Sequence, residues 1–64
     1  MRFDIKDIYP PYNKLVFIEY LPHNGDRYII GKAWLAVNDD GKYIWTLEDN
    51  TIIEDEQVIN WTSY

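Results

Sequence analysis

The chain has 64 residues, with 11 acidic and six basic side chains, one His and no Cys, and 17% of its residues are aromatic. At this length it forms a single domain, residues 1–64, whose core contributes only about 3 to 5 kcal/mol of net stability. A cofactor-sized cleft between two lobes is therefore excluded. Without Cys, neither disulfides nor thiolate metal sites can stabilise the fold, so aromatic packing or self-association must do so.

The first 21 residues predict an irregular start followed by a strand. Residues 3–8 are expected to be extended or to form a single turn, which Pro10 and Pro11 end because proline has no N–H to donate. Residues 14–21 (KLVFIEYL) are dense in β-branched and aromatic side chains on both faces. This pattern predicts a strand in the middle of a sheet.

Two turn signals flank the longest predicted strand, residues 27–37. Asn24-Gly25, within residues 22–26, can adopt the two positive φ angles of a type I′ turn, which predicts a turn that joins two antiparallel strands. Residues 38–41 (NDDG) predict the second turn.

The faces of this strand follow from the two-residue period. One face is expected to be small and apolar, and Gly31 is predicted to mark a bulge because it offers no side chain to the sheet. The first face consists of Ile29, Gly31, Ala33, Leu35 and Val37, and the second of Tyr28, Ile30, Lys32, Trp34 and Ala36.

The second half of the chain continues the strand pattern. Residues 42–48 show the cleanest alternation, with Tyr43, Trp45 and Leu47 on one face. The remaining elements are a turn at residues 49–50, a short strand at 51–53, a solvated loop at 54–56 and a last strand at 58–64. Thr51 and Glu54 have the spacing that could instead cap one helical turn.

Five short antiparallel strands cannot make two full stacked sheets in a chain of this length. We therefore expect an all-β fold, either a five-stranded bent sheet or an SH3-like barrel, with at most one short helical turn. Trp45 is expected to be buried against Leu35 and either Val16 or Ile18, with its indole N–H bonded to an acceptor in the backbone or at the rim.

The sequence offers few groups for catalysis or cofactor binding. His23 is the sole His and stands in a predicted turn, and Ser63, the sole Ser, lies far along the chain. One His without Cys does not make a zinc site, and residues 38–41 lack the ligand spacing of an EF-hand. The Asn60 sequon is interpreted as a chance match. We expect no enzyme, no metal and no cofactor.

Charge is distributed unevenly along the chain. Residues 1–32 carry five basic and four acidic side chains, whereas residues 33–64 carry one basic and seven acidic ones, which gives +1 and −6. Direct nucleic-acid binding needs a cationic surface, so this balance instead favours a protein partner with a basic surface. The densest charge lies at Glu48, Asp49, Glu54, Asp55 and Glu56. These carboxylates form either a partner-binding face or simply a solvated loop.

Eleven aromatic side chains exceed what one small core can enclose. Surface rings are common at interfaces, and Trp34 and Tyr28 are candidates for partner binding beside the carboxylates. The alternative is that the extra rings cover the second side of the sheet and its ends. The rings expected outside the core are Tyr9, Tyr12, Tyr20, Tyr28, Trp34 and Tyr64.

No apolar run approaches the roughly 18 residues that span a bilayer, and acidic residues stand where a signal peptide would be apolar. We expect a protein of the reducing cytoplasm with no membrane partner.

The chain contains three short motifs, at residues 5–11 (IKDIYPP), 15–20 (LVFIEY) and 58–61 (VINW). Together they resemble a domain family of unknown function that is found in phages and prophages of bacteria. Residues 5–11 (IKDIYPP) resemble its W-x-x-V-x-D-x-L-P opening, residues 15–20 (LVFIEY) its V-L-V-Y strand, and residues 58–61 (VINW) its H-W-M-P-L-P close. The chain departs from the pattern in lacking the opening Trp, in having Asn60 in place of His, and in its last three residues. The resemblance implies a small phage-type β-domain and no chemistry.

These observations lead to two hypotheses. The first is a non-enzymatic, phage-encoded acidic module that docks on or inhibits a host or phage protein and acts in the host cytoplasm. The alternative is a self-associating structural module, a homodimer that buries the spare rings against a second copy.

Overall fold

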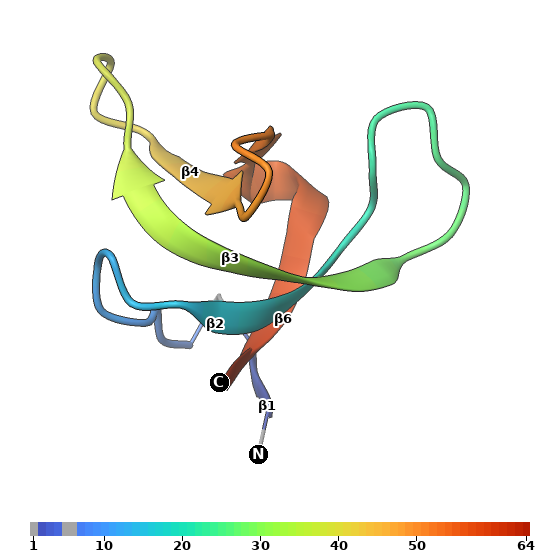
Figure 1. Ribbon diagram of the computed structural model, residues 1–64, viewed down its shortest axis with the longest axis horizontal. Coiled ribbons are helices and arrows are strands. Elements are labelled where there is room, and N and C mark those ends of the chain that lie inside the picture. The colour runs from blue at the N-terminus through green and yellow to red at the C-terminus, as the bar shows by residue number, and fades with distance from the viewer. Residues whose placement is uncertain (1, 5–6) are drawn as a thin grey trace.

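The protein is described by a computed structural model that covers residues 2–4 and 7–64. It is all-β, as predicted: six antiparallel strands form one sheet in the order β1-β6-β2-β3-β4-β5 (Figure 1). Positions 5 and 6, within the predicted opening turn and the opening motif, lie outside the described residues. The elements are β1 (Arg2–Asp4), β2 (Val16–Tyr20), β3 (Ile29–Val37), β4 (Tyr43–Leu47), β5 (Ile52–Glu54), the 3-10 helix η1 (Asp55–Gln57) and β6 (Val58–Ser63).

The prediction of five strands is wrong by one, because β1 was not expected as a strand. It pairs with β6 in the register Phe3↔Trp61, and the two rings lie 4.8 Å apart between centroids. This pairing joins residues almost a whole chain length apart, and three residues carry too little period-two pattern to predict it. β2 lies between β6 and β3, so its predicted central position is confirmed.

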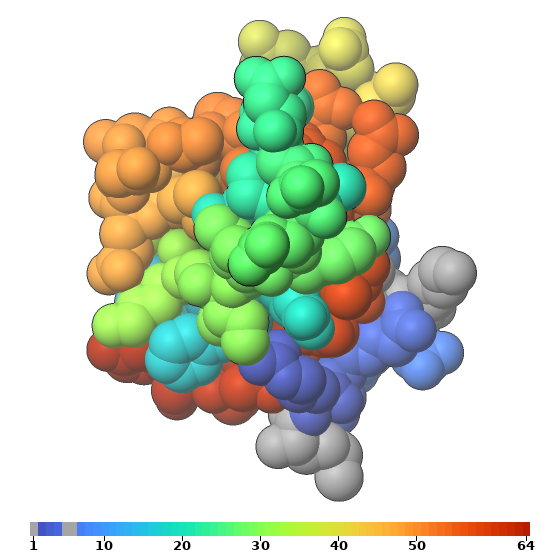
Figure 2. Space-filling model, turned by 90° about the vertical axis from the view of Figure 1, so that its right-hand side faces the viewer, coloured from blue at the N-terminus to red at the C-terminus, as the bar shows by residue number. Residues whose placement is uncertain are grey.

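The connection between β2 and β3 joins two antiparallel strands, as predicted, but it is longer than the predicted turn at residues 22–26. The strands separate after the pair Tyr20↔Ile29, which leaves an eight-residue loop at positions 21–28. Asn24 has φ 61°, but among the glycines of the described residues only Gly41 has a positive φ, so the type I′ turn is wrong. The loop extends from one side of the molecule (Figure 1) and lies, in green, in front of the remaining chain in Figure 2.

Gly31 does not mark a bulge. The pairing of β3 with β2 runs without a shift through Gly31↔Ile18, and the irregularity lies between β2 and β6, at Glu19 and Tyr20. Gly31 instead makes room for the Tyr20 ring, since a Cβ at this position would lie 3.2 Å from Tyr20 Cε1. Tyr20, predicted to lie outside the core, is therefore buried, with 7% of its surface exposed.

The two later turns form as predicted. Asn38 Oδ1 accepts the backbone N–H groups of Asp40 and Lys42, at 2.9 and 3.0 Å, and Gly41 adopts φ 79°. The Asn38 side chain thus accepts backbone N–H groups that have no strand partner where the chain turns back. In the next turn, Asn50 takes φ 71° and donates its N–H to the carbonyl of Leu47.

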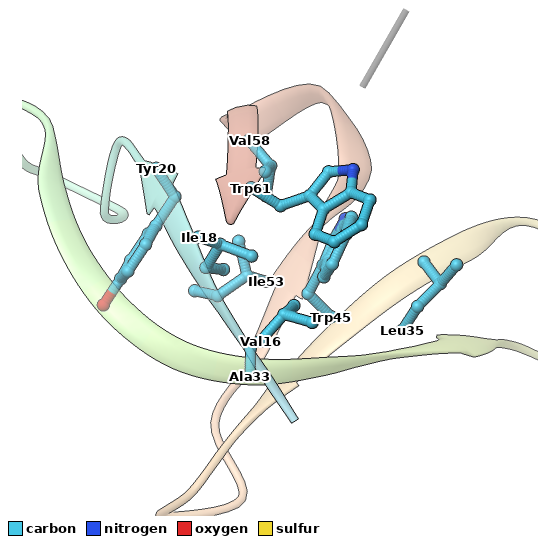
Figure 3. Packing of buried hydrophobic residues seen from close by; sticks show 9 residues of the cluster. All are labelled: Val16, Ile18, Tyr20, Ala33, Leu35, Trp45, Ile53, Val58 and Trp61. Atoms are coloured by element: carbon cyan, nitrogen blue, oxygen red, sulfur yellow. The ribbon is translucent and has the colours of Figure 1, made fainter. Parts of the chain in front are cut away.

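One cluster of buried side chains holds the curved sheet together (Figure 3). Trp45 is fully buried and stands opposite Leu35, and Val16 and Ile18 belong to the same cluster, so the predicted burial of Trp45 is confirmed. Trp34 lies half-buried on the other face of β3, also as predicted. The cluster consists of Val16, Ile18, Tyr20, Ala33, Leu35, Trp45, Ile53, Val58 and Trp61.

Part of the predicted loop at residues 54–56 is the 3-10 helix η1, which meets the expectation of at most one short helical turn. The SH3-like arrangement stays a prediction.

Candidate functional site

A groove of about 740 Å³ lies where the β3–β4 turn approaches the end of β5 and η1. The turn and η1 both lie in the upper part of Figure 1. The register of the edge strand explains this position: Ile44 pairs with Glu54, after which the chain leaves the sheet as η1 and no longer continues beside the start of β4. The turn supplies Asn38 and residues 40–42 to the lining, β4 supplies Tyr43 and Ile44, and the β5–η1 segment supplies Ile52 and residues 54–56.

The groove combines apolar side chains with negative charge. Ile52 is 46% exposed and Tyr43 is 37% exposed, and both line the groove with the half-buried Ile44. The lining also contains four acidic residues, Asp40, Glu54, Asp55 and Glu56, and one basic residue, Lys42. Carboxylates that line a concave surface concentrate their field there, so the groove attracts cationic groups and repels anions.

Asp55 connects the groove to the core. Its Oδ2 accepts a 2.6 Å hydrogen bond from the Tyr9 hydroxyl, and its Oδ1 accepts a 3.0 Å bond from Trp45 Nε1. Asp55 is thus the rim acceptor that was predicted for the indole N–H of Trp45. Burial and the neighbouring Asp55 carboxylate raise the pKa of Tyr9 to about 12. Tyr9 therefore remains a donor to Asp55 at all physiological pH values.

Gln57 fixes the position of η1. Its Nε2 donates to the carbonyl of Leu21 at 2.8 Å, and its Oε1 accepts the backbone N–H of Glu54 at 3.0 Å. The backbone N–H of Leu21 in turn donates to the carbonyl of Gln57 at 2.9 Å. One side chain thus ties the acidic segment to the end of β2, 36 residues away.

Aromatic rings form a continuous series from the core to the groove. The ring of Tyr9 lies 6.4 Å from that of Trp45 and 4.4 Å from that of Tyr43, and the ring of Tyr12 lies 6.1 Å from that of Tyr43. A side-chain hydrogen bond with Tyr43 raises the pKa of Tyr12. These contacts restrict the motion of Tyr43, the only ring of the series that lines the groove.

The structure brings together three of the seven residues predicted to bind a partner. Glu54, Asp55 and Glu56 line the groove. Glu48 and Asp49 occupy the turn between β4 and β5, outside the lining. Hydrogen bonds from the side chain and the backbone N–H of Thr51 lower the pKa of Asp49.

The two predicted rings also lie apart from the groove lining. Trp34 is on the sheet face opposite the core, where it pairs with Thr46, and Tyr28 is 49% exposed at the end of the β2–β3 loop. His23 is exposed in the same loop, in a turn as predicted.

Sequence reasoning missed the groove residues contributed by the β3–β4 turn and β4. Asp40 was interpreted only as a turn residue, and Tyr43 and Ile44 only by their faces. The pairing of β4 with β5 could have indicated the groove, because the register Ile44↔Glu54 places the β3–β4 turn beside the acidic segment. Using it required the register of two strands, which local sequence does not determine.

A second group of surface rings, Phe17 and Tyr64, already contacts a cationic side chain of the same chain, Lys32. Lys32 Nζ lies 4.7 Å from the centroid of the Tyr64 ring and 5.9 Å from that of Phe17, and it donates to the Tyr64 hydroxyl at 3.3 Å. Phe17 and Tyr64 also contact each other, with centroids 5.3 Å apart. These rings cover the second side of the sheet, which is one of the two alternatives for the extra aromatics.

Within residues 2–4 and 7–64, no three His, Cys, Asp or Glu side chains come together in a group that could hold a metal ion. The same part of the chain contains no helix with the length and apolar character needed to cross a bilayer. Comparisons with models of protein families, with curated proteins and with solved structures return no match.

Proposed function

We propose that the chain is a non-enzymatic protein-binding module that docks on a basic segment of another protein through the groove. The observation that carries this proposal is a groove lined by two partly exposed apolar residues, Ile52 and Tyr43, and by four acidic residues. Apolar surface supplies affinity, while the surrounding charge selects the partner and speeds its approach. The charge balance disfavours nucleic acid as the ligand of this groove, because acidic residues repel phosphates.

The resemblance of residues 15–20 and 58–61 to a phage-type domain extends the proposal. In that setting the module is phage-encoded and acts in the cytoplasm of the host, where it docks on or inhibits a host or phage protein. The groove would bind such a partner in either setting.

The experiment is an NMR titration of the ¹⁵N-labelled chain with a heptapeptide of alternating arginine and valine. We expect shifts centred on the amides of Tyr43, Ile44 and Ile52. The double variant Asp40→Lys/Glu56→Lys reverses two exposed groove charges and should abolish binding at low salt. Asp55 is left unchanged because it holds Tyr9 and Trp45.

The matched control is Asp26→Lys/Glu48→Lys, which changes the net charge equally at exposed positions outside the groove. It should reduce affinity only modestly. Equal losses in the two double variants would overturn the groove as the binding site, because binding would then follow net charge alone.

A second candidate function, self-association, is favoured by a different observation. The sheet face opposite the core exposes Ile30 (53%) and Ile52 (46%), with Trp34 half-buried on the same face. A dimer through this face would add apolar burial that a 64-residue core lacks. Sedimentation equilibrium should then show a dimer that Ile30→Lys converts to a monomer. A wild-type monomer at high micromolar concentration would exclude this candidate.

A further inference from the structure

The one ring that lines the groove is held in place from the protein side. Tyr43 packs against Tyr9, which stacks on the buried Trp45 and is itself fixed by its hydrogen bond to Asp55. Tyr12 contacts Tyr43 as well. Yet 37% of the Tyr43 surface remains exposed. The groove therefore presents a preorganised aromatic surface, which loses little conformational entropy when a ligand packs on it.

The groups around this ring match one side chain better than any other. An arginine has a planar guanidinium that stacks on aromatic rings, forked donors that suit carboxylates, and an apolar stem. Tyr43, Asp40 and Glu56 all line the groove. Ile44 and Ile52 line it from the other face of the sheet, because neighbouring residues of a strand point to opposite faces. A lysine would also satisfy the charge. Its ammonium is a compact point charge, however, which has no planar surface to stack on a ring and no pair of parallel donors for a carboxylate.

We infer that the groove recognises arginine in the basic partner, with the guanidinium stacked on Tyr43 and donating to the acidic wall of the groove. This inference rests on the proposed function and specifies its ligand. The volume of about 740 Å³ exceeds that of a single side chain, so residues flanking the arginine also enter the groove.

Lys42 allows a second test of the arginine inference. It is the one cation among the lining residues, is exposed, and precedes Tyr43 in the chain. Its charge opposes that of an incoming guanidinium. Lys42→Gln should therefore tighten binding of an arginine peptide, by more at low salt than at high salt.

The test compares three heptapeptides in which valine alternates with arginine, lysine or citrulline. We expect the arginine peptide to bind about two- to fivefold more tightly than the lysine peptide, because the guanidinium adds planar stacking and forked donors to the cation–π attraction that both side chains have. Citrulline keeps the shape without the charge and should not bind measurably. Upfield shifts of the arginine δ-protons in the wild-type complex should report stacking on the ring.

Tyr43→Leu removes the ring and keeps every charge, so it should bring the arginine and lysine affinities together, while Tyr43→Phe should keep the preference. If Tyr43→Leu does not fold, the wild-type affinity ratio and the δ-proton shifts decide the question. Equal wild-type affinities, or no upfield shift, overturn the arginine inference while the groove remains a site for basic segments. If neither cationic peptide binds, the proposed function fails as well.

Discussion

Asp55 has an unexpected role at the scale of single residues. It belongs to the most acidic segment of the chain, yet its two oxygens accept hydrogen bonds from Tyr9 and Trp45. The carboxylate therefore supports the rings behind the groove, whereas Asp40 and Glu56 are exposed. The adjacent acidic residues Asp55 and Glu56 thus differ in role, because only the Asp55 side chain is bonded to Tyr9 and Trp45.

Tyr9→Phe removes the hydroxyl that donates to Asp55. We expect it to lower the free energy of unfolding by about 1.5 to 3 kcal/mol near neutral pH, the usual value of a hydrogen bond to a charged group. Urea unfolding followed by circular dichroism measures the change. Tyr28→Phe, which removes an exposed hydroxyl, is the control and should stay within about 0.5 kcal/mol of wild type.

Comparing Tyr9→Phe with wild type also tests how the free energy of unfolding depends on pH. Tyr9 has a folded-state pKa of about 12, above the ordinary value of 10.0, so the folded state retains this proton more strongly than the unfolded state. The stability that it contributes is complete below pH 10 and is lost as the pH rises towards 12. The difference between wild type and Tyr9→Phe should therefore shrink over this interval. A constant difference would contradict the assigned bond.

At the scale of elements, η1 and β3 depend on contacts with distant parts of the chain. η1 is only three residues long and is held to β2 by Gln57. The middle of β3 depends on a glycine, because a residue without a side chain at position 31 leaves room for the Tyr20 ring.

Gln57→Ala removes one donor and one acceptor at once. We expect a loss of about 1 to 3 kcal/mol of stability, with faster amide hydrogen exchange at Glu54 and Leu21. Glu56→Ala, at the neighbouring exposed position, should leave the exchange rates unchanged. Equal protection in wild type and Gln57→Ala would mean that η1 is held by other contacts.

Gly31→Val places a branched side chain where a Cβ alone would lie 3.2 Å from the Tyr20 ring. Overpacking of this kind costs about 1 to 3 kcal/mol. Thermal melting measures the loss, and the double variant Gly31→Val/Tyr20→Ala should show a cost smaller than the sum of the two single changes. Simple additivity would show that the ring and the glycine do not interact.

At the scale of the whole molecule, one core supports the entire chain. Residues of five strands meet in a single cluster, and its largest fully buried side chain is Trp45. No second core exists among the described residues to retain structure when this cluster is disrupted.

Trp45→Ala should therefore unfold the protein at room temperature, because the usual cost of about 3 to 5 kcal/mol equals the stability expected of such a core. Trp34→Ala, on the opposite face, should leave the chain folded. Thermal melts of the two variants measure the difference. The reverse result would mean that the faces of β3 and β4 are exchanged.

Local chemistry accounts for what the sequence alone determined. The period-two alternation at residues 42–48 predicted the burial of Trp45, although Tyr43 on the same face is exposed. Asn38 and Gly41 predicted their turn, because that signal involves partners only a few residues apart. The acidic segment at residues 54–56 was also visible in the sequence, although not what it faces. The net negative charge of the second half needed no structure at all.

Tertiary structure alone decided the remaining features. The β1–β6 pairing, the Tyr20 ring over Gly31, and the joining of Tyr9, Trp45 and Asp55 all depend on how distant strands pair and bend. The groove has the same origin, since it exists only where the register of β4 and β5 brings the acidic segment to the β3–β4 turn. Register is set by the packing of the whole sheet around one core, and no short stretch of sequence contains that information.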